Sequence, residues 1–298
     1  MVLPHITICL CTCRRTERLP PLLDALAGQE TAGAFTHSLA VVDNDPAGSA
    51  GPVVRDFAAR SPVPVRQAWE PQPNIARARN RALTLAEGEH VAFIDDDESP
   101  ASDWLRRLHA SARRDRASAV LGPVRPRYRA PPPRWLLRGR FWERDEWPDG
   151  AEVPWTRCRT GNVLLRRDAL EALAPAFDER LATGGEDVDF FRRLAADGHR
   201  FSWCAEAAVH EDVPPHRCTR RYLLRRALLR GRDGLRVTPA PFRATASSAA
   251  ALPLYILLLP PALVCGHHRF MRLAVRIGDH AGRLLAAAGL EPVRSRAP

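Results

Sequence analysis

Four adjacent acidic side chains, Asp95, Asp96, Asp97 and Glu98, follow directly on the apolar residues 91–94, which have the character of a buried strand. Adjacent negative charges repel one another, so at the end of a buried strand they indicate a compensating cation. Carboxylate oxygens are the ligands that Mg²⁺ and Mn²⁺ prefer, and these ions keep open positions that phosphate oxygens fill. The pattern therefore predicts a divalent cation between the protein and a nucleoside diphosphate. A solvated acidic turn is the alternative interpretation.

A second group of carboxylates begins a helix that we predict over residues 186–196. Glu186, Asp187 and Asp189 occupy three of its first four positions and follow two glycines, which would let a substrate approach the backbone. Carboxylates in a first helical turn are stabilised by the helix dipole, so capping accounts for one or two of them. Because three exceed what capping requires, one of them is predicted to act as a general base that activates an acceptor hydroxyl.

Two further polar positions are predicted to meet a nucleotide. Asp43 follows a strand predicted over residues 38–42, where its carboxylate can accept an N–H group from the edge of a nucleobase. An Asx turn formed with Asn44 and Asp45 is the alternative. Arg79 lies on a predicted helix with small residues on one face and arginines on another, so its guanidinium can meet a base or a phosphate.

The elements that position these residues alternate between strand and helix along the first half of the chain. This order predicts an α/β fold with a doubly wound, mostly parallel sheet. Ligand sites in such sheets gather at the carboxyl ends of the strands, and those ends fall here at Thr12, Asp43 and Asp95. Three separate segments are therefore expected to converge on one edge. The predicted strands cover residues 5–12, 38–42, 65–68, 91–94, 160–165 and 200–204, and the predicted helices cover residues 18–29, 51–60, 74–87 and 186–196.

Composition narrows the class of partner. All 44 basic residues are arginine, and the net charge is +10. A basic surface suits nucleic acid, anionic lipid or a sugar phosphate, because each presents phosphates to arginine. The arginines are scattered in pairs without a nucleic-acid-binding motif, which argues against a nucleic-acid partner. Seven cysteines, an odd number, predict reduced thiols and a cytoplasmic protein.

The remaining segments suggest how the chain is organised. A connector rich in Pro, Arg and Trp, residues 123–160, separates a nucleotide-binding half, 1–122, from an acceptor half, 161–235. Its tryptophans either bind sugar rings or pack the connector onto the core. Residues 236–298 are predicted to form a helical, apolar and basic appendage that associates with a membrane. Residues 249–265 within it are apolar but contain three prolines, so a segment that rests on or dips into the membrane surface is favoured over a spanning helix or a core helix.

Taken in order, these motifs resemble glycosyltransferase family two, and within it the glucosyltransferases that build succinoglycan-type exopolysaccharides. The resemblance covers residues 4–230 and departs from the family at the first strand. That strand usually ends in Pro-Thr-Tyr-Asn, whereas here it ends in Cys-Thr-Cys-Arg and lacks the aromatic ring that stacks on the base. The motifs that carry the resemblance are residues 8–14, 42–44, 78–80, 93–98, 161–162 and 185–187.

The resemblance implies a GT-A type fold and roles for individual residues. Asp187 matches the catalytic base, with Glu186 its neighbour, and Asp43 matches the residue that contacts the base, usually uracil. The metal is implied to contact Asp95, Asp97 and His210. The nucleotide is implied to contact Thr12, Arg14, Asp43, Arg79, Asp95 and Asp96. The acceptor is expected at Trp104, Gly161, Asn162 and Gly185.

The resulting prediction is an inverting, metal-dependent hexosyltransferase at the inner face of the cell membrane. It would use Mn²⁺ or Mg²⁺ to move a sugar from a nucleoside-diphosphate sugar, usually UDP-linked, to a saccharide or lipid-linked saccharide in polysaccharide biosynthesis. A sugar nucleotidyltransferase and a metal-dependent nuclease are the alternatives, since both use acidic clusters. The former normally has a glycine-rich loop after the first strand, which this chain lacks, and a DNA-cleavage assay would identify the latter. The absence of a Gly-x-Gly-x-x-Gly motif argues against a dinucleotide oxidoreductase.

Overall fold

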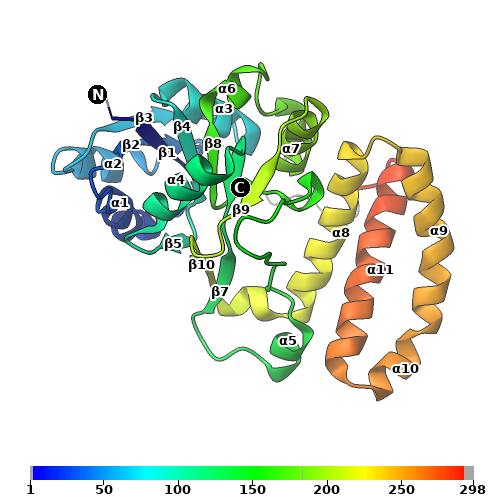
Figure 1. Cartoon of the computed structure of the whole chain (residues 1–298). Helices are drawn as coiled ribbons and strands as arrows, with labels where there is room; N and C mark the ends of the chain where they lie inside the picture. The colour runs from blue at the N-terminus through cyan, green and yellow to red at the C-terminus, as the bar shows by residue number, and fades with distance from the viewer. Residues whose placement is uncertain (1–2, 183, 292–298) are drawn as a thin grey trace.

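The computed structural model describes residues 3–182 and 184–291 and has three parts (Figure 1). A seven-stranded sheet is covered by helices on both faces, a three-stranded sheet lies below it, and a group of long helices stands at one side. The strand order of the large sheet is β3-β2-β1-β4-β8-β6-β9. Its strands are β1 (His5–Thr12), β2 (Thr36–Asp43), β3 (Val65–Trp69), β4 (His90–Asp95), β6 (Ala119–Leu121), β8 (Val163–Arg166) and β9 (Phe201–Trp203).

The first four strands of the large sheet pair in parallel, whereas β8 runs antiparallel to both of its neighbours. In the register of the parallel part, Thr12 lies opposite Asp43, and Cys11 lies opposite Asp95. The three strand ends therefore meet at one edge, as the sequence predicts. An α/β fold with a mostly parallel, doubly wound sheet is confirmed, although the sequence does not reveal that the strand after the connector is reversed.

Two hydrophobic layers make the sheet doubly wound. Leu23 of α1 (Leu19–Ala27), Phe57 of α2 (Gly51–Ala58) and Trp104 of α4 (Trp104–Asp115) are buried on one face. On the other face lie α3 (Ile75–Leu85), α6 (Arg167–Glu171) and α7 (Glu186–Ala196), which contribute small or aromatic side chains. Burial of apolar side chains on both faces is what allows near-continuous hydrophobic strands to pair in parallel.

The smaller sheet comes from segments far apart in the chain. Its order is β5 (Glu98–Pro100), β10 (Val209–Val213) and β7 (Val124–Tyr128). The connector contributes β7, α5 (Arg134–Gly139) and the 3₁₀ turn η2 (Trp155–Arg157). Its tryptophans pack within the protein, which favours the packing interpretation over sugar binding: Trp142 is buried, and Trp147 contacts Trp203 with ring centroids 5.0 Å apart.

The carboxyl-terminal part is helical, as expected, and consists of α8 (Arg220–Val237), α9 (Pro241–Leu257), α10 (Leu259–Val264) and α11 (His267–Ala287). Helices α8 and α11 approach closely at glycines. A Cβ atom on Gly231 would lie 2.0 Å from the carbonyl oxygen of Asp279, and one on Gly282 would lie 2.1 Å from that of Leu228. None of the helices in the described ranges combines the length and the hydropathy needed to cross a membrane.

Candidate active site

Asp95, Asp96, Asp97 and Glu98, here called the acidic centre, occupy the end of β4 and the turn into β5. Asp96 accepts hydrogen bonds from Thr12 Oγ1, at 2.8 Å, and from Arg15 Nη1. Asp97 Oδ2 lies 3.1 Å from Nη1 of both Arg15 and Arg217. Two arginines from distant segments therefore bring positive charge into the acidic centre and fix the orientation of its carboxylates.

Glu98 and Asp95 meet over the backbone of Gly161, which is buried. A Cβ atom on this glycine would lie 2.8 Å from Glu98 Oε1 and 2.9 Å from Asp95 Oδ2, so only glycine fits beneath the two carboxylates. Burial and the neighbouring charge of Asp95 raise the pKa of Glu98. Burial, with the charge of Asp97 added and that of Arg79 opposing, raises the pKa of Asp95 to about 6. The positive charge near Asp95 and Glu98 is thus too small to offset their burial and mutual repulsion.

Arg79 joins the acidic centre to the second group of carboxylates. It is 8% exposed, its Nη1 donates to Glu186 Oε1, and its Nη2 lies 3.6 Å from Asp95 Oδ1. Burial lowers the pKa of Arg79, but the charges of Glu186 and Asp95 outweigh burial and raise it. The two acidic segments, which lie about 90 residues apart in the sequence, therefore share one site.

Asp187 lies in the first turn of α7, next to the buried Glu186. Its Oδ2 is 3.7 Å from Nε of Arg159, and its side chain is 18% exposed, so the carboxylate remains accessible beside Arg79 and Glu186. Carboxylates at this position are favoured by the helix dipole. Asp187 is thus positioned as a solvent-accessible proton acceptor, whereas Glu186 is committed to Arg79.

The turn before α7 differs from the expectation that a substrate approaches its glycines. Gly184 and Gly185 adopt φ values of 131° and 93°, which glycine alone accommodates readily. A Cβ atom on Gly185 would lie 2.9 Å from Val237 Cγ1, and one on Gly184 would lie 3.1 Å from Asp233 Oδ2. Helix α8 thus fills the space beside Gly185 on the side where a Cβ atom would lie, and an acceptor contact at Gly185 stays a prediction.

Asp43 forms the local turn that was the alternative to base binding. Its Oδ1 accepts from the N–H of Asp45 and its Oδ2 from that of Ala50, at 2.9 and 2.6 Å. Arg14 Nε donates to Asp45 at 3.1 Å, so Arg14 lies at this edge and not in the acidic centre. A cavity of about 340 Å³ adjoins Asp43, with the exposed indole of Trp69 on its wall. Its other lining residues include Val41, Ala47, Gly48, Gly51, Val54, Arg55, Gln67 and Ala68.

Two predicted acceptor residues lie in the core instead. Trp104 and Asn162 are both 0% exposed, and the indole N–H donates to Asn162 Oδ1 at 2.7 Å. The Asn162 amide donates to the carbonyl oxygens of Pro123 and Ala207, each at 2.8 Å. With no exposed atoms left, Trp104 and Asn162 cannot contact an acceptor, and they tie three loops together beneath the site. Gly161 has the same outcome, because protein carboxylates occupy the space above it.

His210 is also placed differently from the prediction that it contacts metal. It is exposed on β10, and successive residues of a strand face opposite sides of a sheet, so its neighbour Glu211 faces the acidic centre. Glu211 Oε2 accepts from Arg144 at 2.8 Å, and its Oε1 lies 3.6 Å from Arg217. Glu211, Arg144 and Arg217 are not among the residues predicted from the sequence. An alternation argument applied to β10 would have selected Glu211.

The acidic centre has the oxygen donors that a divalent cation prefers, but these donors are not already arranged around a metal position. Among the described residues, no three His, Cys, Asp or Glu side chains are arranged to hold a metal ion. However, Glu98 Oε1 is buried without a hydrogen-bond partner, beside Asp95. An unpartnered buried carboxylate oxygen is costly, and a hard cation satisfies it. The carboxylate oxygens of the acidic centre are therefore consistent with Mg²⁺ or Mn²⁺.

Comparison with solved structures supports the fold. The mannosyltransferase PcManGT from Pyrobaculum calidifontis, in complex with GDP-Man and Mn²⁺, is 20% identical, with 98% of this chain and 89% of that chain covered and a TM-score of 0.66. TarS of S. aureus (1–349), in complex with UDP-GlcNAc, is 15% identical, with 97% and 93% covered and a TM-score of 0.57. Both neighbours are glycosyltransferases of GT-A type, so the GT-A type of fold is confirmed.

Comparison of sequences assigns the family. Residues 7–173 match the model of Glycosyl transferase family 2. The succinoglycan biosynthesis protein ExoM of Rhizobium meliloti (strain 1021) is 35% identical over an alignment 304 positions long, gaps included, that covers 97% of this chain and 94% of that protein. The galactofuranosyltransferase GlfT1 of Mycobacterium tuberculosis is 30% identical over 66% of each chain. With the family model and a near full-length relative in agreement, the chain belongs to glycosyltransferase family 2.

Proposed function

We propose that this protein is an inverting glycosyltransferase of polysaccharide biosynthesis. It transfers a sugar from a nucleoside-diphosphate sugar to a hydroxyl group of a saccharide or lipid-linked saccharide. The observation that carries the proposal is the ion-paired path from Asp95 through Arg79 to Glu186, which puts the accessible Asp187 beside the acidic centre. The relatives named for polysaccharide and O-antigen biosynthesis support the substrate class.

The reaction needs one displacement. The Asp187 carboxylate accepts the proton of the acceptor hydroxyl while the hydroxyl oxygen bonds to the anomeric carbon. The bond from that carbon to the diphosphate oxygen breaks, and its electron pair leaves with the nucleoside diphosphate. Attack from the face opposite the leaving group inverts the anomeric centre, so no enzyme nucleophile is needed. Arg15 and Arg217, at 3.1 Å from Asp97, supply positive charge near the leaving group.

We assign the metal to Asp95 and Asp97, with the unpartnered Glu98 Oε1 nearby. When bound, Mn²⁺ or Mg²⁺ would supply Lewis-acid stabilisation of the diphosphate. The base of the nucleotide is assigned to the cavity that adjoins Asp43 and is lined by Trp69, close to Arg14; the Asp43 carboxylate itself is committed to the local turn. Trp69 offers the aromatic face that the end of β1 lacks.

A thermal-shift screen tests the nucleotide assignment. With Mn²⁺ present, we expect one of the two nucleotides, uridine diphosphate or guanosine diphosphate, to raise Tm and the other to leave it unchanged. A nucleotide at 100 times its Kd stabilises the native state by about 2.7 kcal/mol. Removing Mn²⁺ with a chelator is expected to diminish the shift, and Asp97→Asn is expected to do the same. If neither nucleotide changes Tm and the protein cleaves DNA with Mn²⁺, the nuclease alternative replaces this proposal.

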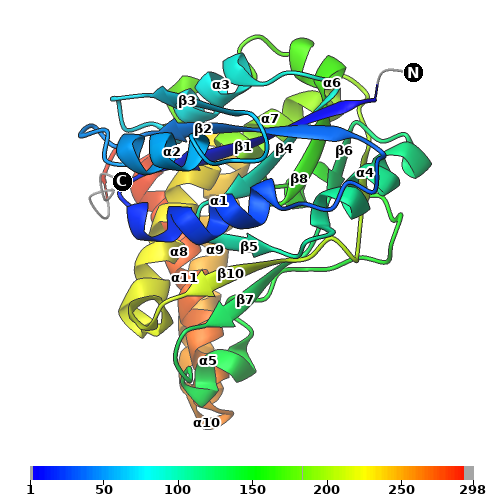
Figure 2. The same cartoon turned by 90° about the vertical axis from the view of Figure 1, so that its left-hand side faces the viewer.

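We also propose that the protein works at the inner face of the cell membrane and rests there on the apolar tip, defined by residues of α9 and α10. Val264 is 89% exposed and Leu257 73% exposed. Figure 2 shows α5 at the same end of the molecule as α10. Exposed arginines lie on α5, at Arg134 and Arg138, and near the start of α11, at Arg269. Apolar side chains beside cations suit an anionic lipid surface. The apolar tip comprises Leu254, Ile256, Leu257, Leu263 and Val264.

The vesicle prediction follows from these exposed side chains. Leu257→Glu with Val264→Glu is expected to lower partitioning onto phosphatidylglycerol vesicles at least about tenfold, because each buried aliphatic side chain contributes about 1.5–3 kcal/mol. Cosedimentation measures the bound fraction. Phe242→Glu with Leu290→Glu is the matched control: both residues are exposed, but Phe242 lies at the start of α9 and Leu290 follows the end of α11, so neither belongs to the apolar tip. Equal binding by the tip variant and the wild type would contradict the proposal.

A further inference from the structure

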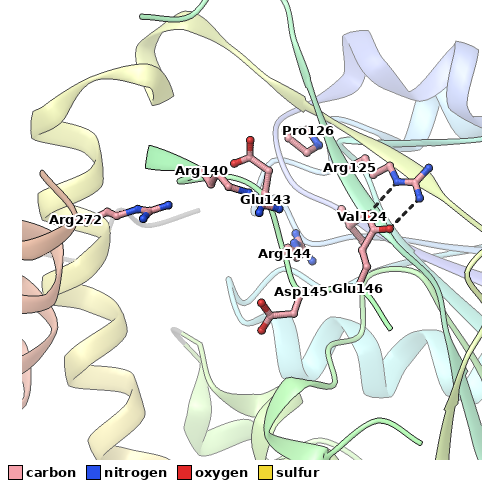
Figure 3. A pocket seen from close by; sticks show the side chains of 9 residues that line it. All are labelled: Val124, Arg125, Pro126, Arg140, Glu143, Arg144, Asp145, Glu146 and Arg272. Atoms are coloured by element: carbon pink, nitrogen blue, oxygen red, sulfur yellow. Dashed lines mark hydrogen bonds and ion pairs between the residues drawn. The ribbon is translucent and has the colours of Figure 1, made fainter. Parts of the chain in front are cut away.

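A second cavity, of about 850 Å³, lies outside the centre described so far. It is enclosed by the start of β7, by residues 140–146 of the connector and by α11, which contributes Arg272 (Figure 3). Its volume lies within the range of ligand-binding cavities in proteins. The lining residues are Val124, Arg125, Pro126, Arg140, Glu143, Arg144, Asp145, Glu146 and Arg272.

Some of the charged side chains that line this cavity form ion pairs with one another or with neighbouring residues, and others do not. Glu146 is paired with Arg125, at 2.9 Å, and Asp145 with Arg157, at 3.0 Å, so two of the three acids are neutralised. The exposed Arg140 forms neither an ion pair nor a side-chain hydrogen bond with any residue in the described ranges, although its charge helps to lower the pKa of Glu146.

Arg272 Nε donates to the carbonyl oxygen of Gly139 at 2.9 Å, and its other N–H groups have no hydrogen-bond partner among residues 3–182 and 184–291. Its remaining N–H groups, like those of Arg140, are therefore available to a ligand. Among the acids, only Glu143 has no ion-pair partner in the described part of the chain. The wall therefore has more uncommitted guanidinium donors than carboxylates, and donors of this kind match the oxygens of a phosphate or diphosphate.

The cavity adjoins the acidic centre. Arg144 lines it and also donates to Glu211 at 2.8 Å, and its charge acts on the pKa of both Asp95 and Glu98. On the other side, Asp145 is paired with Arg157 of η2, which packs against α7, the helix of Asp187. A ligand in the cavity would thus lie next to the reacting groups without occupying the nucleotide edge at Asp43.

The cavity also lies toward the apolar tip. Arg272 belongs to the first part of α11, which follows α10, and Trp135 of α5 contacts His267 of α11 with ring centroids 5.4 Å apart. Figures 1 and 2 both show α5 and α10 at the same end of the molecule. An acceptor whose polar part enters the cavity would have any attached chain near the exposed apolar side chains.

We infer that this cavity binds the phosphate or diphosphate group of the acceptor, through Arg140 and Arg272. The inference rests on the proposed glycosyltransferase function and deepens it, because it names an anionic acceptor and the residues that recognise it. The phosphate belongs either to a soluble saccharide phosphate or to the head group of a lipid-linked saccharide. In both cases the phosphate fixes the acceptor so that one saccharide hydroxyl reaches Asp187.

The test measures binding of inorganic pyrophosphate by calorimetry, with the donor site saturated by Mn²⁺ and the nucleoside diphosphate that gives the larger thermal shift. Arg140→Gln and Arg272→Gln are each expected to weaken pyrophosphate binding at least about tenfold, since each removes a charge-assisted contact. Arg138→Gln is the matched control, because Arg138 is an exposed arginine of α5 that does not line the cavity. Its affinity for pyrophosphate is expected to equal that of the wild type.

Two further probes identify the source of the phosphate. Octyl diphosphate is expected to bind more tightly than glucose 1-phosphate if the group comes from a lipid-linked acceptor, and the reverse order indicates a soluble acceptor. The inference is overturned if the wild type binds no pyrophosphate beyond the donor site, or if both cavity variants bind it as the wild type does. The stabilisation of the same variants by nucleotide is measured separately. If the cavity binds no phosphate but nucleotide still stabilises the protein, the glycosyltransferase proposal stands. If the wild type binds no nucleotide, that proposal is overturned as well.

Discussion

Asp187→Asn is expected to lower kcat about 10²- to 10⁴-fold, which is the range that a general base contributes. The carboxamide is nearly isosteric with the carboxylate but cannot accept the acceptor proton at neutral pH. Because Asp187 is only partly buried and its one ion pair, with Arg159, is 3.7 Å long, the fold and nucleotide binding should be retained. The measurement is kcat for sugar transfer, together with Tm and nucleotide affinity.

Asp168→Asn is the matched control for this substitution. Asp168 also lies in the first turn of a short helix, α6, and is exposed and paired with Arg166. The same chemical change there is expected to leave kcat unchanged. Wild-type turnover by Asp187→Asn would show that the proton goes elsewhere, and Glu186 could not simply replace it because its carboxylate is engaged by Arg79.

The second large effect is expected for Arg79→Met, which leaves Glu186 and Asp95 without their shared cation. Breaking a buried ion pair by removing one partner typically costs about 3–5 kcal/mol of unfolding free energy. Denaturant unfolding measures this loss. Burial already raises the pKa of Glu186, and losing Arg79 raises it further. A carboxyl whose pKa is higher in the folded protein destabilises the fold as pH rises, so the deficit of the variant should shrink when the solution is acidified.

Arg77→Met provides the comparison for this substitution. Arg77 is on the same helix, but its pairs with Glu70 and Glu179 are 3.7 and 3.6 Å long and partly exposed. Such pairs contribute at most about 1 kcal/mol. Adding Glu186→Gln to Arg79→Met is expected to recover part of the lost stability. If Arg79→Met lowers the free energy of unfolding no more than Arg77→Met does, the buried ion pairs of Arg79 do not stabilise the fold.

Local patterns predict the nucleotide-binding half of the sheet well, because its strands and helices are long enough to show their periodicity. The first strand matches the predicted residues 5–12; in the other half, α7 matches 186–196, and β9 lies within the predicted 200–204. By contrast, β5 and β6 are not among the predicted strands; they have three residues each, and β5 pairs with a strand more than 100 residues later. Such short elements carry no period, so their pairing depends on tertiary contacts that one sequence does not display.

The same distinction applies to the site. Carboxylates at the ends of long elements were found from their positions, since strand ends and helix starts are locally encoded. Of the arginines that hold them, Arg79 lies on a predicted helix, whereas Arg144 and Arg217 come from segments without regular periodicity and reach the site only through the fold. The resemblance implies His210 as a metal contact, but its neighbour Glu211 faces the acidic centre, since a shift of one residue along a strand reverses the face. Glycines mark close approach, but a sequence does not say whether a substrate or another part of the protein is the neighbour.

Helix α8 touches both the turn at Gly185, through Val237, and the glycine contacts with α11, through Gly231. Helix α8 therefore couples the packing of α11 to the turn that precedes Glu186 and the proposed base, Asp187. The helices after α8 thus help to hold the turn before α7 in place. Shortening the chain at its carboxyl end is therefore expected to loosen this turn.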